Sequence, residues 1–120
     1  MTKMPAPNII AIDNDDVRYN FESTAQKSNL RLDPLSIETL QVNITKLCNK
    51  ACLHCHVDSS PKRTEQMALK TVDRCLEILA EHAAIKNLDL TGGAPELNPH
   101  FDYFVREARK LDKHVMVRHN

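Results

Sequence analysis

The chain has 120 residues, 42% of them apolar and 27% charged, a size and balance typical of one small soluble domain. Sixteen Lys and Arg offset sixteen Asp and Glu, which excludes the basic footprint of a protein that binds nucleic acid or anionic lipid. The apolar group around Ile9 and Ile12 is too short for a signal peptide or a membrane span. We therefore expect a cytoplasmic protein without membrane or nucleic-acid partners.

The first part of the chain differs in pattern from the rest. Residues 1–36 combine prolines with polar side chains and show no sustained apolar period, which predicts a loosely ordered lead-in. Residues 37–120 form a second region, which opens with the alternation of a strand that buries one face. Its apolar positions are Leu40, Val42 and Ile44. This strand runs directly into Cys48, so residues 47–63 are predicted to form the loop at its carboxyl end.

A helix is predicted over residues 64–82, with Thr64 as its cap and Glu65 in its first turn. Apolar residues recur there at spacings of three and four, which is typical of a helix with one buried face. They are Met67 or Ala68, Val72, Cys75 or Leu76, and Leu79. Cys75 shares this stripe, so we interpret it as a core residue and not as a metal ligand.

A second strand and a second helix follow. Residues 85–91 alternate apolar and polar positions and end at a Gly-Gly break, residues 92–93. Asn98 is expected to cap the next helix, with Pro99 at its first position. The apolar stripe of that helix is Phe101, Val105, Ala108 and Leu111. Residues 114–120 are predicted to form a third strand.

Strands that alternate with helices predict an α/β fold with about three parallel strands, two helices and right-handed crossovers. The carboxyl ends of parallel strands meet at one edge of the sheet, so we expect the cysteine loop and the Gly-Gly break to lie together. Three strands and two helices neither close a barrel nor cover both faces of a sheet. Region 37–120 therefore has the expected character of one part of a larger α/β unit.

The cysteine loop contains the motif C-x3-C-x2-C, formed by Cys48, Cys52 and Cys55. Thiolates bind soft metals and iron-sulfur clusters, and three cysteines within eight residues favour a metal centre over disulfides. Three ligands leave one iron of a four-iron cluster open to a substrate. The alternative is a structural zinc module with His56 as fourth ligand, although zinc ligands seldom crowd into nine residues.

The segment CNKACLHC resembles the cysteine signature of the radical S-adenosylmethionine (SAM) superfamily. The resemblance implies the N-terminal part of a partial (βα) barrel, in which Cys48, Cys52 and Cys55 hold a 4Fe-4S cluster. It implies that the open iron chelates SAM, whose cleavage releases a 5′-deoxyadenosyl radical. His54 stands where the superfamily often has an aromatic residue near adenine; a stacked imidazole and a solvated loop histidine are the two interpretations.

Residues 91–96, TGGAPE, stand where the superfamily has its Gly-Gly-Glu segment. The resemblance implies that Gly92 and Gly93 contact the methionyl part of SAM, because glycines let a ligand approach the backbone. Ala94 occupies the usual Glu position and Glu96 follows two residues later, so a SAM contact by Glu96 is a separate expectation that the motif leaves open. No residue is assigned a catalytic role.

Two longer segments resemble the arsenosugar-biosynthesis radical SAM proteins, and the likeness runs from about residue 32 to the C-terminus. They are IETLQVNITKLCNKACLHCHVDSSPKRTEQM and LDLTGGAPELNPHF. The resemblance implies adenosyl transfer to a methylated arsenic substrate, an electron donor protein, and a second polypeptide or further chain that completes the barrel. An inactive fragment of such an enzyme is the remaining alternative.

Overall fold

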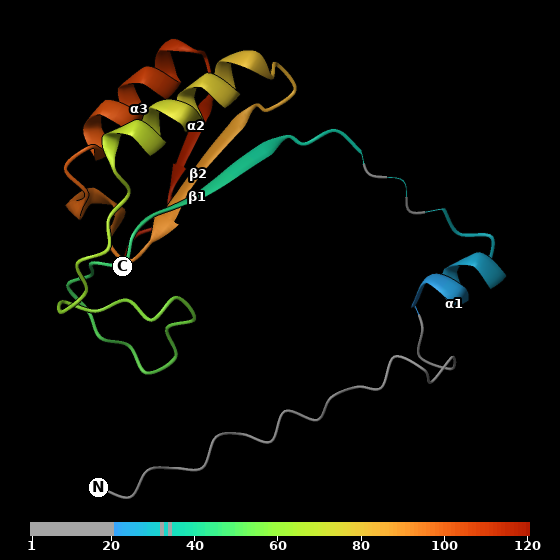
Figure 1. Ribbon diagram of the computed structural model, residues 1–120, viewed down its shortest axis with the longest axis horizontal. Coiled ribbons are helices and arrows are strands. Elements are labelled where there is room, and N and C mark those ends of the chain that lie inside the picture. Colours follow the sequence, from blue (N-terminus) through green and yellow to red (C-terminus); the bar gives the residue numbers. More distant parts are fainter. Residues whose placement is uncertain (1–20, 32, 34) are drawn as a thin grey trace, which may run out of the picture. The chain divides into compact units, whose positions relative to one another are not determined.

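A computed structural model describes residues 21–31, 33 and 35–120 (Figure 1). The chain divides into two compact units, residues 1–35 and 36–120. In the first unit, helix α1 (Phe21–Lys27) has an acid in its first turn and a base in its last, as the helix dipole favours. The pattern of residues 1–36 did not predict this helix. The other residues of the predicted lead-in, 1–20, 32 and 34, lie outside the described residues.

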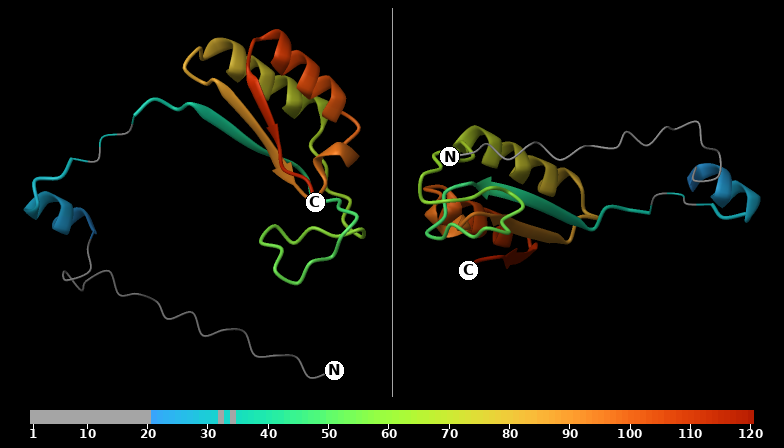
Figure 2. Two further views of the ribbon diagram at one scale, coloured as in Figure 1. Left: turned by 180° about the vertical axis from the view of Figure 1, so that it is seen from behind. Right: turned by 90° about the horizontal axis from the view of Figure 1, so that it is seen from below.

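The second unit is a three-stranded parallel sheet with strand order β1-β2-β3. Its elements in chain order are β1 (Thr39–Thr45), α2 (Leu69–Glu81), β2 (Asn87–Gly92), the 3-10 helix η2 (Pro95–Leu97), α3 (Phe101–Lys110) and β3 (His114–Val117). Figures 1 and 2 show α2 and α3 side by side on one face of the sheet. The predicted α/β class, with three parallel strands and two helices of a partial barrel, is thereby confirmed.

The core lies between the sheet and these two helices. Its fully buried side chains include Ile44, Val72, Leu79, Leu88, Leu90 and Phe104. Burying each such side chain contributes about 1.5–3 kcal/mol, so this one layer supplies most of the apolar stabilisation of the unit. The other face of the sheet carries mainly polar side chains, among them Gln41 and Asp89, because strand residues alternate between faces. None of the described helices is long and apolar enough to cross a membrane.

The predicted start of the first long helix is wrong, since α2 begins at Leu69 and not at Thr64. The residues before it are extended and pair with the free edge of β1. The backbone N–H of Met67 donates to the carbonyl of Ile44 (2.9 Å), and that of Lys46 donates to the carbonyl of Glu65 (2.9 Å). Satisfying an exposed strand edge outweighs a single capping hydroxyl at Thr64.

The predicted cap of the second helix is also wrong, since α3 begins at Phe101 with His100 at its N-cap. Asn98 is 3% exposed, and its amide Nδ2 donates to the carbonyls of Ile44 (2.9 Å) and Met67 (3.2 Å). Its Oδ1 accepts the backbone N–H of His100 (2.8 Å). Asn98 thus joins β1, the entry to α2 and the start of α3. The buried residues of α3 are Phe104 and Ala108. The predicted apolar stripe included Ala108 but not Phe104, so the buried face of the helix is turned toward Phe104.

Candidate functional site

The cysteine loop leaves β1 at its carboxyl end and returns beside it. Cys48 N–H donates to the carbonyl of Ser60 (3.2 Å), and Ser60 N–H donates to the carbonyl of Lys46 (3.2 Å). These two hydrogen bonds close the base of the loop, so residues 49–59 project from the sheet as one excursion (Figure 1). The three cysteines of the motif are therefore carried by a single loop with a fixed base.

Gly92 and Gly93 pack directly against the chain that leads into this loop. Gly93 N–H donates to the carbonyl of Thr45 (2.8 Å), and the next N–H donates to the carbonyl of Leu47 (2.9 Å). A Cβ at Gly92 would lie 2.3 Å from the oxygen of Thr45, and one at Gly93 would lie 2.3 Å from the oxygen of Leu47. Gly92 also has a φ of 120°. Glycine is thus required here for close packing and for backbone conformation.

This packing brings the Gly-Gly segment to the first cysteine. A Cβ at Gly93 would lie 3.1 Å from the Cβ of Cys48. The end of the third strand reaches the same place, because Asn120 Nδ2 donates to the sulfur of Cys48 (3.5 Å) and to Oδ1 of Asn49 (2.7 Å). The contact by Asn120 was not predicted, and its position just after a strand was the signal for it. All three strand ends therefore converge near Cys48.

The sulfur atoms differ in environment. Cys48 is buried and its Sγ accepts the backbone N–H of Lys50 (3.4 Å), Cys55 is half-buried, and Cys52 is exposed. All four cysteines of the chain are free thiols. In the part of the chain that the structure describes, no three His, Cys, Asp or Glu side chains are arranged to hold a metal ion. The loop supplies three cysteine thiols, which are the ligands that suit an iron-sulfur cluster. The three sulfur atoms are not gathered around one point in this structure.

The pKa of the Cys55 thiol lies below its ordinary value. The main cause is the backbone N–H of Ser59, which donates to Cys55 Sγ (3.4 Å), and the N–H of Val57 adds to it. Donors of this kind favour the thiolate, which is the form that binds metals. Cys75 behaves in the opposite way, because burial on α2 raises the pKa of its thiol and it packs against the core.

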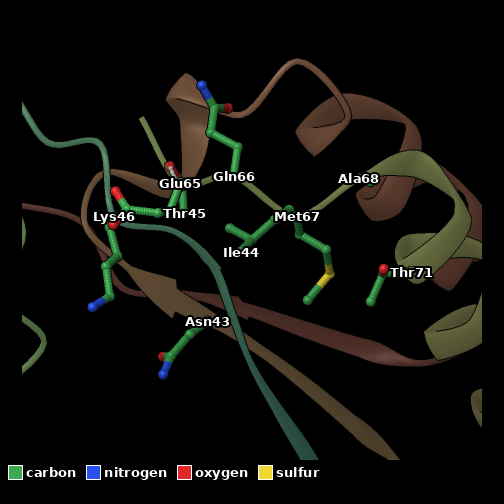
Figure 3. Close-up of a pocket in the computed structure, with 9 residues that line it drawn as sticks. All are labelled: Asn43, Ile44, Thr45, Lys46, Glu65, Gln66, Met67, Ala68 and Thr71. Atoms are coloured by element: carbon green, nitrogen blue, oxygen red, sulfur yellow. Dashed lines mark hydrogen bonds between the residues drawn. The ribbon is translucent and has the colours of Figure 1, made fainter. Parts of the chain in front are cut away.

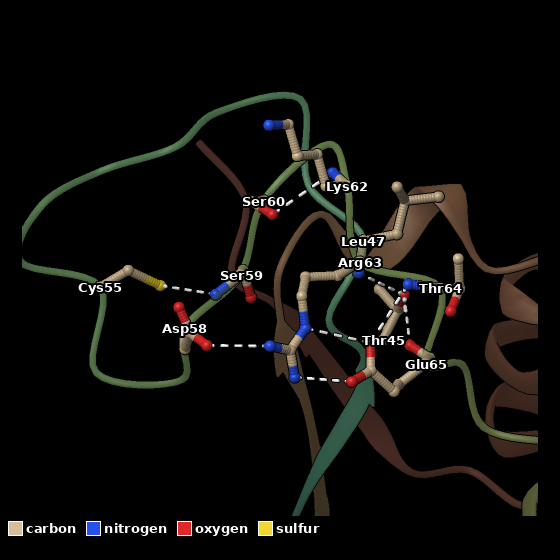
Figure 4. Close-up of polar contacts among 10 residues, drawn as sticks. All are labelled: Thr45, Leu47, Cys55, Asp58, Ser59, Ser60, Lys62, Arg63, Thr64 and Glu65. Carbon is tan, nitrogen blue, oxygen red and sulfur yellow. Dashed lines mark hydrogen bonds and ion pairs between the residues drawn. The ribbon is translucent and has the colours of Figure 1, made fainter.

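Arg63 ties the cysteine loop to the segment that returns along β1 (Figure 4). Its Nη1 donates to Asp58 (2.9 Å), and its Nη2 and Nε donate to the two carboxylate oxygens of Glu65 (2.6 and 3.0 Å). Asp58 adopts a left-handed backbone with a φ of 53°, where the loop turns. The pKa of Glu65 is lowered by its own backbone N–H and then by Arg63. The guanidinium is thus engaged in holding the loop.

The remaining predicted site residues lie around this edge. His54 and His56 are exposed on the loop. Ala94, at the position where the motif usually has Glu, is buried. Glu96 lies in η2, and its Oε1 is 3.8 Å from Nδ1 of His119. A SAM contact by Glu96 or His54 remains a prediction.

A polar cluster that was not predicted from the sequence lies on the sheet face opposite the helices. The Asp89 side chain is 3% exposed and accepts hydrogen bonds from Gln41 Nε2 (2.9 Å) and from Arg118 Nε (3.0 Å) and Nη2 (2.8 Å). These bonds, that of Arg118 above all, hold the pKa of Asp89 below its usual value. The signal was a charged residue, Asp89, between Leu88 and Leu90 in the middle of a predicted strand.

A cavity of about 480 Å³ lies along the edge of β1 and the segment that enters α2 (Figure 3). Its lining includes Asn43, Thr45, Met67 and Thr71. Neither the motif cysteines nor the two glycines line it. Its position is therefore distinct from the place where the strand ends meet.

The chain is similar in sequence to one known superfamily and to several curated proteins. Residues 42–120 match the family model of the radical SAM superfamily. The chain is 26% identical over 74 residues to GTP 3',8-cyclase of Chlorobaculum tepidum, covering 62% of this chain and 22% of that protein. It is 30% identical over 83 residues to GTP 3',8-cyclase of Helicobacter pylori, covering 68% and 26%. It is 28% identical over 76 residues to the probable GTP 3',8-cyclase of Sulfurisphaera tokodaii, covering 63% and 24%.

The chain spans about a quarter of the length of these curated relatives. The matches support the superfamily and do not single out its arsenosugar-biosynthesis members.

Proposed function

The chain belongs to the radical SAM superfamily, and from this premise we propose that Cys48, Cys52 and Cys55 bind a 4Fe-4S cluster next to a SAM site at Gly92 and Gly93. The observation that carries the proposal is the packing of Gly93 against Cys48 at the carboxyl edge of the sheet. A reduced cluster would supply the electron that cleaves SAM to a 5′-deoxyadenosyl radical.

The chain's own residues contribute binding and orientation. Ser59 N–H favours the thiolate of Cys55, and Arg63 fixes the loop that carries the three ligands. The N–H of Gly93 is already paired with Thr45, so the carbonyl oxygens of the Gly-Gly segment are the groups suited to accept the ammonium of SAM. The space that a side chain would fill at either glycine is taken by the backbone of Thr45 and Leu47, so the lack of a side chain is what brings this segment to the cysteine loop.

The test is anaerobic reconstitution with iron and sulfide, followed by metal analysis and electron paramagnetic resonance with and without SAM. We expect about four irons per chain and a spectrum that SAM perturbs. Replacing any one of Cys48, Cys52 and Cys55 with Ala should abolish cluster retention. Cys75→Ala is the matched control and should retain the iron.

Three outcomes would contradict the proposal. Equal loss of iron in Cys75→Ala and in the triad variants would overturn the ligand assignment. Colourless protein with one zinc per chain would favour the zinc module, for which His56→Ala provides the follow-up variant. Soluble, folded protein that takes up no metal would favour an inactive fragment.

The substrate of this reaction is the subject of a second, more specific proposal. We propose adenosyl transfer to a methylated arsenic compound, supported by the two segments of the sequence that resemble the arsenosugar-biosynthesis proteins. The second candidate is a guanine nucleotide, because the relatives described above are named GTP 3',8-cyclases. Either activity belongs to a complete barrel, so we further propose an electron donor protein and additional polypeptide that completes it. Mass spectrometry of the products formed from each substrate by the reconstituted chain together with the polypeptide that completes the barrel distinguishes the two candidates.

A further inference from the structure

The two faces of the sheet in residues 36–120 differ in chemistry. Apolar strand residues such as Leu88 and Leu90 face α2 and α3, whereas Gln41 and Asp89 lie on the other face, which neither helix covers (Figure 2). A carboxylate buried in a sheet is costly unless it is paired and hydrogen-bonded. Asp89 meets this condition through Arg118, a residue that follows β3. The Asp89–Arg118 pair therefore indicates that this face of the sheet is suited to contact polar groups.

Asp89 acts as the anchor and Arg118 as the exposed part of the pair. The side chain of Asp89 is 3% exposed and that of Arg118 is 66% exposed. Nε and Nη2 each donate to the carboxylate, which occupies two of the five N–H groups of a guanidinium. Within the described residues, the other three N–H groups have no acceptor. Arg118 is thus an oriented fork whose remaining donors are available to a ligand.

The position of Arg118 connects it to the candidate cofactor site. Its backbone N–H donates to the carbonyl of Leu90 (2.9 Å), which fixes it at the carboxyl end of β3. Two residues later, Asn120 donates to the sulfur of Cys48. Ligands of open α/β sheets bind at this end of the strands. Arg118 thus lies two positions before the residue that contacts the cysteine loop, at the edge of the sheet where a ligand is expected.

We propose that Arg118, oriented by Asp89, binds an oxyanion group of the substrate, an inference that rests on the proposed function. A planar guanidinium fork recognises carboxylate, phosphate and related tetrahedral oxyacids by paired N–H donors. The two substrate candidates share this chemistry, because an arsenic oxyacid and the triphosphate of GTP are both oxyanions. Asp89 balances the formal charge of Arg118, so recognition depends on the geometry of the donors.

The experiment is isothermal titration calorimetry of the full chain with three probes: sodium dimethylarsinate, GTP and inorganic phosphate. Arg118→Gln should lower the affinity for the probe that the wild type binds most tightly by about tenfold or more, the loss expected for hydrogen bonds to a charged group. Arg118→Lys should restore only part of the affinity, because an ammonium lacks the fork. Asp89→Asn should also weaken binding although the guanidinium is retained.

Arg74→Gln is the matched control, since Arg74 is a guanidinium on α2 that is 59% exposed and also paired with an acid. It should bind the probes like the wild type. Wild-type affinity in Arg118→Gln, or no binding of any probe to the wild type, would overturn the inference. The preferred probe identifies the source of the oxyanion, whether arsenical, nucleotide or free phosphate.

Cluster content and the SAM-dependent spectrum are measured on the same samples, so the two proposals fail separately. If no cluster forms but Arg118→Gln still loses oxyanion affinity, the proposed cofactor site is wrong and the oxyanion site stands. If the cluster and the SAM response are normal while all probes bind Arg118→Gln unchanged, the proposed cofactor site stands and the oxyanion site is wrong.

Discussion

At the scale of single residues, the Gly-Gly segment has a structural role that is independent of any ligand. Gly93→Ala would place a methyl group 2.3 Å from the carbonyl oxygen of Leu47, which belongs to the backbone and cannot rotate away. We expect a destabilisation of about 1–3 kcal/mol, the usual cost of overpacking, measured by urea denaturation. Ala51→Gly, at an exposed loop position, is the control and should change stability little. An unchanged urea midpoint in Gly93→Ala would contradict this packing.

Asp89 gives the chain a predictable response to acid. Its pKa is lower in the folded chain because Arg118, and to a lesser degree Gln41, donate hydrogen bonds to the carboxylate. Such a group contributes stability above its unfolded pKa, about 4, and that stability is lost as the pH falls through the folded pKa.

The corresponding variant is Asp89→Asn, which should be less stable than the wild type by about 1–3 kcal/mol at pH 7, since one partner of a buried hydrogen-bonded pair is removed. The difference should shrink as the pH falls below about 4. Urea midpoints at several pH values measure it, with the exposed Asp102→Asn as control. A difference that is constant over this pH range would show that the carboxylate charge is not responsible.

At the scale of elements, the cysteine loop is held by its base and by Arg63. Arg63→Ala should change the global stability by less than about 1 kcal/mol, because its ion pairs are near the surface. It should nevertheless speed amide hydrogen exchange at loop residues such as Cys55 and Ser59, since the link to Glu65 is lost. Arg74→Ala, which removes an exposed ion pair on α2, is the control. Unchanged exchange in the loop would mean that the backbone contacts of its base are sufficient.

The same scale shows why two helix starts were misplaced. Thr64 and Asn98 are residues of the kind that cap helices, and a local pattern has no means of showing a better partner elsewhere in the chain. The edge of β1 attracts the segment before α2, and the carbonyls of Ile44 and Met67 attract the amide of Asn98. Both contacts involve residues that are distant along the chain, so the local spacing of residues does not predict them.

At the scale of the whole molecule, the described part of the chain separates a covered apolar face from an uncovered polar one. Residues 36–120 bury one layer between the sheet and two helices, and the opposite face presents Asp89 and Arg118. Parallel sheets are normally covered on both faces. This arrangement agrees with a chain that spans about a quarter of the length of its curated relatives.

The sequence alone determined the α/β class, the parallel orientation of the strands, the cysteine motif and its position at the carboxyl edge. It did so because hydrophobic periodicity and motif spacing are local properties, and because the connection rules of parallel sheets leave few arrangements. Only the tertiary structure decided that Gly93 packs on Cys48, that Asn120 reaches the cysteine loop and that Asp89 pairs with Arg118. These contacts join strands that are far apart in the chain, and their distances depend on register and side-chain packing, which no local pattern records.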